Sequence, residues 1–309
     1  MHIWAQTINI NQDLAKQLIE SQTNLKVVSI KIFGEGWDNI VYLINNEYVF
    51  RFARRQMGVT CMENEIAVLP YIAKNVSFSL SSPQIIGQPS NAYPYFFSGY
   101  RILPGEPLSE TQAHLINNKI FAETLALWLK ELHGLNIPQS YNSLIKGDQS
   151  WRLDVPGRIE TCKKTISDYA HYFLQADFDK NDLFIALDIL GSFNFAKAEK
   201  ASFVHGDLYS RHILVDENMN PTGIIDWGDI HIGNPGIDLS IGFMLFDQEA
   251  QNVFFNTYGN IDNQTKKIAI FRALTHSIRL LPYCYENKDE HLKDWTILAL
   301  KKVFQELNT

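Results

Sequence analysis

The hydrophobic pattern changes character about a third of the way along the 309-residue chain. Between Lys26 and Phe52 it consists of three short runs rich in β-branched and aromatic residues, VVSIKIF, NIVYLI and EYVFRF, separated by turns that contain glycine or asparagine. Runs of this length and spacing predict three antiparallel strands. The segment IIGQPSNAYPYFFSGYRIL at 85–103 predicts two more strands around a Pro/Asn turn. The first third of the chain therefore predicts a small antiparallel β-sheet.

After Pro104-Gly105 the spacing becomes helical. Phe121, Leu125 and Leu129 are spaced for one face of a helix, and His133-Gly134 supplies its stop. Helical patterns also cover 154–175, 183–196, 266–281 and 291–307, and two shorter ones lie before the break, at 11–20 and 62–74. Only residues 203–227 interrupt the helical part, with short apolar runs bounded by turns. We expect an α+β fold of two lobes, a small antiparallel β-sheet lobe at 1–103 and a larger, mainly helical lobe at 104–309.

Composition limits the classes of protein to which the chain can belong. With 46% hydrophobic and 20% charged residues it is globular and long enough for two lobes. Its net charge of -7 disfavours a nucleic-acid partner, because phosphate backbones bind basic surfaces. The sequence shows no leader pattern and no apolar run of about 20 residues, which predicts a cytoplasmic protein without a membrane partner. Its three cysteines have no CxxC spacing and predict neither a disulfide framework nor a zinc site.

The residues that carry chemistry lie in the interruption at 203–227. There Asp207 and Asp226 each flank a short apolar run, and a turn at 218–221 separates the runs. A hairpin would bring the two carboxylates close together, where they repel each other unless a cation or a shared proton compensates. A divalent metal ion is the natural compensating charge, since hard cations prefer oxygen ligands. Two solvated turn aspartates are the alternative.

The surrounding residues favour the metal. The pattern HGDLxxxxILVD at 205–216, followed by IIDWGD at 224–229, resembles the catalytic segment of the aminoglycoside phosphotransferase family, which has a protein-kinase-like fold. GNPGIDL at 233–239 and LALWLKELHGL at 125–135 are similar to two further stretches of that family. Resembling segments run from about residue 32 to 245. The resemblance implies a two-lobed kinase-like fold.

The same resemblance implies a role for each matched residue. Asp207 corresponds to the catalytic aspartate that orients the substrate hydroxyl, and Asp226 to the aspartate that binds magnesium. His205 and Asp238 would brace the loop through buried hydrogen bonds. His212 stands where the family usually has a second magnesium ligand, asparagine. Because magnesium prefers oxygen, His212 either binds it through water or weakens one metal site, and histidine here also resembles the macrolide phosphotransferases.

In the first lobe the resemblance points to the nucleotide site. Gly34 and Gly36 lie in FGEGWDN, where the family has the loop that covers the nucleotide. Arg51 stands at the position of the lysine that pairs with phosphate, and Glu65 at that of its helical partner. The hinge between the lobes would bind the base through backbone groups of Tyr100, Arg101, Ile102 and Leu103. ATP and GTP stay open as alternatives at this point.

These observations predict a magnesium-dependent phosphotransferase that moves the γ-phosphate of ATP or GTP to a hydroxyl of a small molecule. Residues 141–309 carry most of the negative excess, which favours a cationic acceptor such as an aminoglycoside antibiotic and hence a resistance enzyme. His212 and the aromatic segment 241–246 instead support a macrolide or other apolar alcohol. Choline, homoserine and sugars are further acceptors of this kind. A non-catalytic nucleotide-binding pseudokinase is the alternative from another class, and the oligomeric state stays open.

Overall fold

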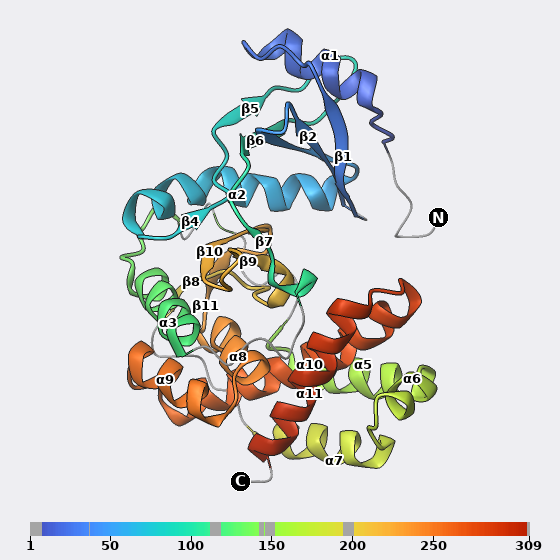
Figure 1. Ribbon diagram of the computed structural model, residues 1–309, viewed down its shortest axis with the longest axis vertical. Coiled ribbons are helices and arrows are strands. Elements are labelled where there is room, and N and C mark those ends of the chain that lie inside the picture. Colours follow the sequence, from blue (N-terminus) through green and yellow to red (C-terminus); the bar gives the residue numbers. More distant parts are fainter. Residues whose placement is uncertain are drawn as a thin grey trace.

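The computed structural model describes residues 8–36, 38–111, 119–141, 145, 152–193 and 201–307. It has two parts along its long axis, a smaller one built around a sheet and a larger one built of helices (Figure 1). The expected α+β fold of two lobes, with an antiparallel sheet in the first, is confirmed. The division at 103/104 stays a prediction.

The sheet of the first part has five strands in the order β1-β2-β3-β6-β5, all antiparallel to their neighbours. Their bounds are Ile30–Glu35 (β1), Asn39–Ile44 (β2), Tyr48–Ala53 (β3), Ile85–Gly87 (β5) and Phe97–Arg101 (β6). Asn45 and Asn46, with φ of 56° and 54°, form the turn between β2 and β3. Asparagine tolerates this left-handed conformation, which matches the twist of a hairpin. The five strands predicted from the sequence are thus all present.

Two helices accompany this sheet, α1 (Gln12–Gln22) and α2 (Gln56–Asn75). Helix α1 is capped by Asn11, whose side chain accepts a hydrogen bond from the Leu14 amide at 2.9 Å. Helix α2 begins six residues before the predicted Met62. Gly58 obscured this start in the sequence, yet it is required there, because a Cβ at this position would lie 2.4 Å from the carbonyl oxygen of Asp38.

The larger part is mainly helical. The predicted helical patterns fall on α3 (Lys119–Gly134), α5 (Val155–Asp168) with α6 (Ala170–Gln175), α7 (Lys180–Gly191), α10 (Asn263–Glu286) and α11 (Glu290–Leu307). Residues 194–196 of the pattern at 183–196 lie outside the described residues. Two helices were not predicted, α8 (Gly236–Leu245) and α9 (Gln248–Tyr258). Helix α8 has no amphipathic pattern because every one of its residues is buried.

Short strands lie between the two parts. Strands β4 (Ser79–Leu80), β10 (Pro221–Ile224), β9 (Ile213–Val215) and β7 (Glu106–Pro107) form a four-stranded sheet in that order. Strand β8 (Ser202–Val204) pairs with β11 (His231–Gly233). Short 3-10 turns lie at Leu108–Glu110 (η1) and Ser210–His212 (η3). The expected hairpin of β9 and β10 therefore exists, and it is flanked by strands that the sequence did not reveal.

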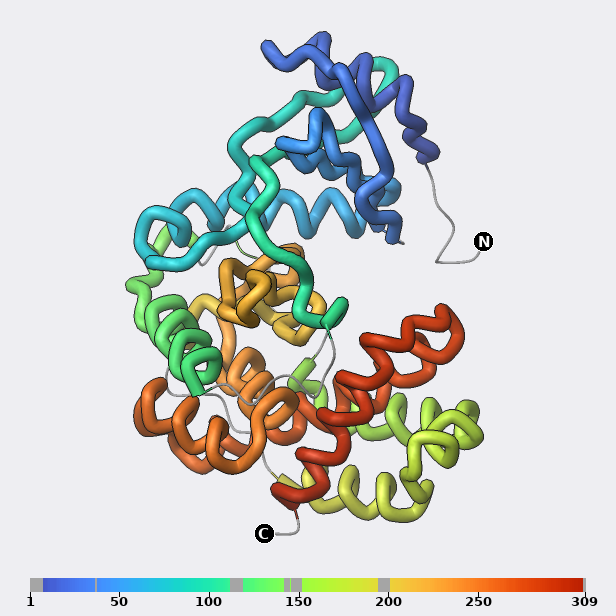
Figure 2. Tube along the Cα trace, viewed as in Figure 1, coloured from blue at the N-terminus to red at the C-terminus, as the bar shows by residue number. Residues whose placement is uncertain are grey.

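Helix α10 holds the larger part together. It packs against α8, α11, α5 and α7, and the tube in Figure 2 shows it within the helical half. The buried residues of this part form one continuous core that extends to Val68 and Ile72 of α2. No helix among the described residues is both long and apolar enough to span a bilayer. Helix α10 also lies beside the segment predicted to be catalytic, because its Arg272 contacts Asp207.

Candidate active site

The loop between β8 and β9 fixes the position of Asp207. Asp238, in the first turn of α8, accepts hydrogen bonds from the backbone amides of His205 at 2.6 Å and Gly206 at 2.9 Å. Gly206 has φ of 87°, and a Cβ there would lie 2.4 Å from the carbonyl oxygen of Asp229. Only glycine fits this conformation without strain. A buried carboxylate and a required glycine therefore hold the loop from both sides.

His205 also stabilises this loop, through hydrogen bonds from both of its ring nitrogens. Its Nε2 donates to the carbonyl oxygen of Ile225 at 2.9 Å, and its Nδ1 accepts from the amide of Asp207 at 3.2 Å. Burial lowers the pKa of His205, although Asp238 acts in the opposite direction. A neutral imidazole with its proton on Nε2 satisfies both contacts. These hydrogen bonds are the bracing expected of His205 and Asp238.

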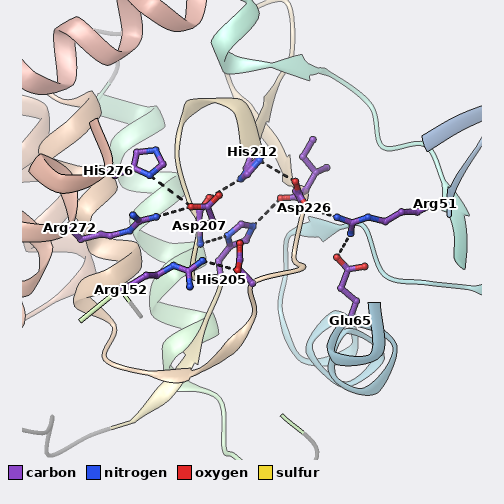
Figure 3. Close-up of polar contacts among 11 residues, drawn as sticks. Arg51, Glu65, Arg152, His205, Asp207, His212, Asp226, Arg272 and His276 are labelled. Atoms are coloured by element: carbon purple, nitrogen blue, oxygen red, sulfur yellow. Dashed lines mark hydrogen bonds and ion pairs between the residues drawn. The ribbon is translucent and has the colours of Figure 1, made fainter. Parts of the chain in front are cut away.

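Asp226 is held by a residue from the other lobe. It follows β10 with φ of 60°, and its Oδ1 lies 2.9 Å from a guanidinium nitrogen of Arg51 on β3. Arg51 also forms an ion pair with Glu65 of α2, as Figure 3 shows. Burial alone would lower the pKa of Arg51, but Glu65 and Asp226 raise it, so the guanidinium stays charged. The structure thus brings together three residues that are separated by up to 175 positions in the chain.

His212 connects the two carboxylate residues. Its Nδ1 lies 2.8 Å from the carbonyl oxygen of Asp207, and its Nε2 lies 3.4 Å from Oδ2 of Asp226. Since a carbonyl oxygen can only accept, Nδ1 carries a proton, and a neutral ring then turns the lone pair of Nε2 toward the carboxylate. Two facing lone pairs favour a cation or a second proton between them.

The donor atoms of His212 and Asp226 can hold part of a magnesium shell. Among the described residues no group of three or more His, Cys, Asp and Glu side chains converges as a metal site. Magnesium commonly takes one or two protein ligands and completes its shell with phosphate oxygens and water. The residues therefore fit the ion only together with a bound nucleotide.

Asp207 has a partner that the sequence analysis missed. Its Oδ1 lies 2.7 Å from Nη2 of Arg272 and 3.9 Å from Nδ1 of His276, both on α10 (Figure 3). Arg272 is almost fully buried, whereas the side chain of Asp207 is 28% exposed. Burial would raise the pKa of Asp207, but the neighbouring basic groups, of which Arg272 acts most strongly, together outweigh it and hold the pKa well below the usual range. An arginine and a histidine within the buried run of α10 were the available signal.

Asp207 lines a cavity of about 550 Å³. Helix α10 contributes half of the described lining residues, and α5 contributes Arg158, with Arg152 just before it. The titratable lining described by the structure, besides Asp207, consists of Arg152, Arg158, Asp229, Arg272, His276 and Arg279. Arg152 and Asp229 form an ion pair at 2.8 Å. Asp207 therefore lies beside a pocket that is rich in arginine.

The predicted loop glycines and hinge residues lie in or directly after strands β1 and β6 of the first sheet. Gly34 is in β1 and Gly36 follows it, with the Gly36 amide donating to the Asn39 carbonyl at 3.0 Å. The loop residue between them and β2, Trp37, lies outside the described residues. The amide of Ile102 donates to the Glu47 carbonyl at 2.8 Å, so it is not available to a nucleotide base.

The other hinge residues differ in what they face. Tyr100 lies near Arg51 and Glu65: burial raises the pKa of its hydroxyl, Arg51 acts to lower it and Glu65 to raise it. Arg101 pairs with Glu47 at 2.6 Å on the exposed side of the sheet. Leu103 lies against β10, because a Cβ at Gly223 would be 3.3 Å from it. Tyr100 is thus the hinge residue whose side chain lies closest to the charged site.

Known proteins resemble the chain in sequence and in fold. The sequence model of the phosphotransferase enzyme family matches residues 29–270. A short stretch of 49 residues is 35% identical to the uncharacterized protein YcbJ of Bacillus subtilis (strain 168), and it spans 16% of that curated relative's length.

Three solved structures share the fold over almost their whole length. One is APH(2")-IIia in complex with GDP and kanamycin, with a TM-score of 0.68 and 21% identity over 96% of this chain and 99% of that one. A second is the GDP complex of aminoglycoside 2'-phosphotransferase-IIIa, with a TM-score of 0.70 and 20% identity over 96% and 100% of the two chains. The third is macrolide 2'-phosphotransferase type I, with a TM-score of 0.62 and 19% identity over 93% and 97%. At these identities the likeness establishes the fold alone, and it confirms the kinase-like fold expected from the sequence.

Proposed function

The chain belongs to the phosphotransferase enzyme family, and we propose that it transfers the γ-phosphate of ATP or GTP to a hydroxyl of a small molecule in a magnesium-dependent reaction. The observation that carries the proposal is the line of contacts from Arg51 through Asp226 and His212 to Asp207. It joins groups suited to phosphate and metal with a carboxylate suited to an acceptor hydroxyl.

On the nucleotide side, Asp226 and His212 would hold the metal and Arg51 the phosphates. Magnesium held by these two side chains would supply positive charge to offset the charge of the phosphates during transfer. Glu65 keeps the Arg51 side chain in place as the phosphates arrive. Related structures contain GDP or ATP, which supports a purine nucleotide but leaves its identity open.

On the acceptor side, Asp207 would orient the hydroxyl toward the γ-phosphorus. The hydroxyl oxygen forms the new bond to phosphorus, the bond to the β–γ bridging oxygen breaks, and its electron pair leaves on the nucleoside diphosphate. The proton of the hydroxyl passes to Asp207. Because Arg272 holds the pKa of Asp207 low, orientation contributes more than basicity, in keeping with the loose transition state of phosphoryl transfer.

Neither of the two acceptor classes expected from the sequence gains support from the residues cited for it. Among the acidic residues of 141–309, Asp289 pairs with Arg211, Glu290 with Lys293 and Glu249 with Lys119, and these three acids are not among the described residues that line the pocket. The aromatic residues at 241–246 that suggested a macrolide are buried core. The aminoglycoside proposal therefore rests on similarity to enzymes solved with kanamycin, gentamicin or streptomycin.

A non-catalytic pseudokinase is the weaker alternative. Arg51 forms the ion pair that the family's lysine would form, and His212 directs a donor atom at Asp226. Both departures from the usual pattern thus retain a role in the site. We propose a cytoplasmic location, where the nucleotide co-substrate is available.

Substitution of Asp207 tests the proposed function. Purified protein is assayed for magnesium-dependent transfer of labelled γ-phosphate from ATP and GTP to kanamycin, erythromycin, and neutral and anionic sugars. We expect Asp207→Asn to lower kcat by about 10² to 10⁴ while nucleotide affinity, measured by calorimetry, changes little. Asp168→Asn, an exposed carboxylate on α5, serves as the matched control and leaves activity unchanged. Full activity of Asp207→Asn, or no nucleotide binding by the wild type, would contradict the proposal.

A further inference from the structure

The pocket beside Asp207 has the opposite charge from the chain as a whole. The chain carries a net charge of -7, yet the described residues that line this cavity include four arginines and two aspartates. The aspartates are each engaged by an arginine, Asp207 by Arg272 at 2.7 Å and Asp229 by Arg152 at 2.8 Å. Counted over these described residues alone, the formal charge of the lining is +2.

Helix α10 presents three of the cavity's basic side chains on one face. Arg272, His276 and Arg279 are spaced by four and three residues, which places them one above another on a helix. Helix α5, which packs against α10, contributes Arg158 from the facing side. Two elements thus direct positive charge into one space.

The arginines differ in burial. Arg152 and Arg272 are 4% and 5% exposed, whereas Arg279 is exposed at the rim. In the part of the chain that the structure describes, no acidic side chain forms an ion pair with Arg279. Burial lowers the pKa of Arg272 and Asp207 raises it, while the neighbouring Arg152 and Arg279 act to lower it, as expected where like charges gather. An anion in the cavity would offset this repulsion.

His276 adds a neutral polar group to the same wall. Burial lowers its pKa to about 3, and Arg272 acts in the same direction, so the ring is uncharged at neutral pH. Its Nε2 is buried and has no hydrogen-bond partner among the described residues. A ring of this kind can hydrogen-bond to a polar group of a bound molecule without repelling it.

We propose that the acceptor is an anionic small molecule, whose phosphate or carboxylate group binds Arg279, Arg158 and Arg272 while its hydroxyl reaches Asp207. This inference rests on the proposed phosphotransferase function. A cavity of about 550 Å³ is within the usual range for small-molecule sites. Guanidinium groups bind carboxylate and phosphate through paired hydrogen bonds, which gives them geometric selectivity as well as charge. A polycationic aminoglycoside would be repelled by the same side chains.

Calorimetry on the full chain tests the charge preference. The protein is first saturated with magnesium and a non-hydrolysable ATP or GTP analogue, so that the nucleotide site is filled. It is then titrated with glucose 6-phosphate, glucuronate, glucosamine and kanamycin. We expect at least one of the two anions to bind at least tenfold more tightly than either cation, and the tighter anion tells whether phosphate or carboxylate is preferred.

Variants locate the bound anion. Arg279→Gln and Arg158→Gln should each weaken anion binding at least tenfold, whereas Lys164→Gln, on the exposed side of α5, should not. Arg279 is exposed, so its substitution leaves the core intact, and thermal melting of each variant checks the fold. Tighter binding of kanamycin, no binding of either anion, or anion binding that ignores both arginine variants would overturn the inference.

Nucleotide binding and magnesium-dependent nucleotide hydrolysis are measured on the same samples. If the wild-type protein binds the anion but neither binds nor hydrolyses the nucleotide, the proposed function is refuted and the anion site is retained. Intact nucleotide turnover without a preference for anions would refute only the inference.

Discussion

The catalytic segment has two sides, a first around Asp226 and a second around Asp207, which are built alike but carry opposite charge. Asp226 pairs with Arg51 of β3, and Asp207 pairs with Arg272 of α10, so each carboxylate meets an arginine from a distant element (Figure 3). On the first side a second carboxylate, Glu65, shares the arginine. On the second side further arginines surround the pair. The first side has an excess of negative charge and the second an excess of positive charge.

This difference indicates which partner completes each side. A negative cluster with converging oxygen and nitrogen donors is completed by a cation, and a positive cluster by an anion. His212 lies between the two and touches both, through its two ring nitrogens. The two sides can therefore be disturbed separately, and each should respond in its own way.

The largest effect is expected on the negative side, from Asp226→Asn. Loss of the carboxylate removes the charged metal ligand, so we expect kcat to fall at least about 100-fold, with weaker nucleotide binding at every magnesium concentration. Nucleotide titrations at several magnesium concentrations measure this. Asp168→Asn controls for loss of one surface charge. Activity that stays unchanged across the magnesium series would remove Asp226 from the metal site.

A smaller effect is expected from the arginine that Asp226 shares with Glu65. Arg51→Ala should raise the nucleotide KM or lower kcat by about tenfold, because charge-assisted hydrogen bonds contribute about 1.5 to 3 kcal/mol. Arg51→Lys should recover part of the loss, since it restores charge without the planar fork. A kinetically silent Arg51→Ala would show that the pair with Glu65 serves only the fold, and the likeness between the two sides would then be superficial.

The smallest effect is expected on the positive side, from Arg272→Gln, and it concerns pH. Arg272 holds the pKa of Asp207 low, so its removal raises that pKa and moves the acid limb of the kcat/KM profile to higher pH. The other charged or titratable groups facing Asp207 are His276 of α10, His212 of η3 and Arg152, and they stay in place. Arg272→Lys keeps the charge and should keep the wild-type profile. If both variants keep the wild-type limb, Asp207 does not control it.

Much of the fold followed from local patterns. The five strands of the first sheet, the hairpin of β9 and β10 and most of the long helices could be predicted, because each depends on the periodicity of its own residues. The candidate residues Asp207, His212 and Asp226 lie within one short segment, so a hairpin alone places them together. Arg51 and Glu65 are close in sequence and were matched through the order of motifs.

Contacts between distant elements were decided only by the tertiary structure. Helix α8 is buried on every side and so has no helical face to detect, and Gly58 hides the start of α2 because the close approach of Asp38 cannot be read from its own segment. Arg272 lies 65 residues from Asp207 and reaches it only because α10 packs beside the loop. The sequence by itself determined the net charge of the chain and the number of its arginines. The packing of α10 against α5 determined where it gathers, because electrostatic interaction depends on distance in space rather than on position in the chain.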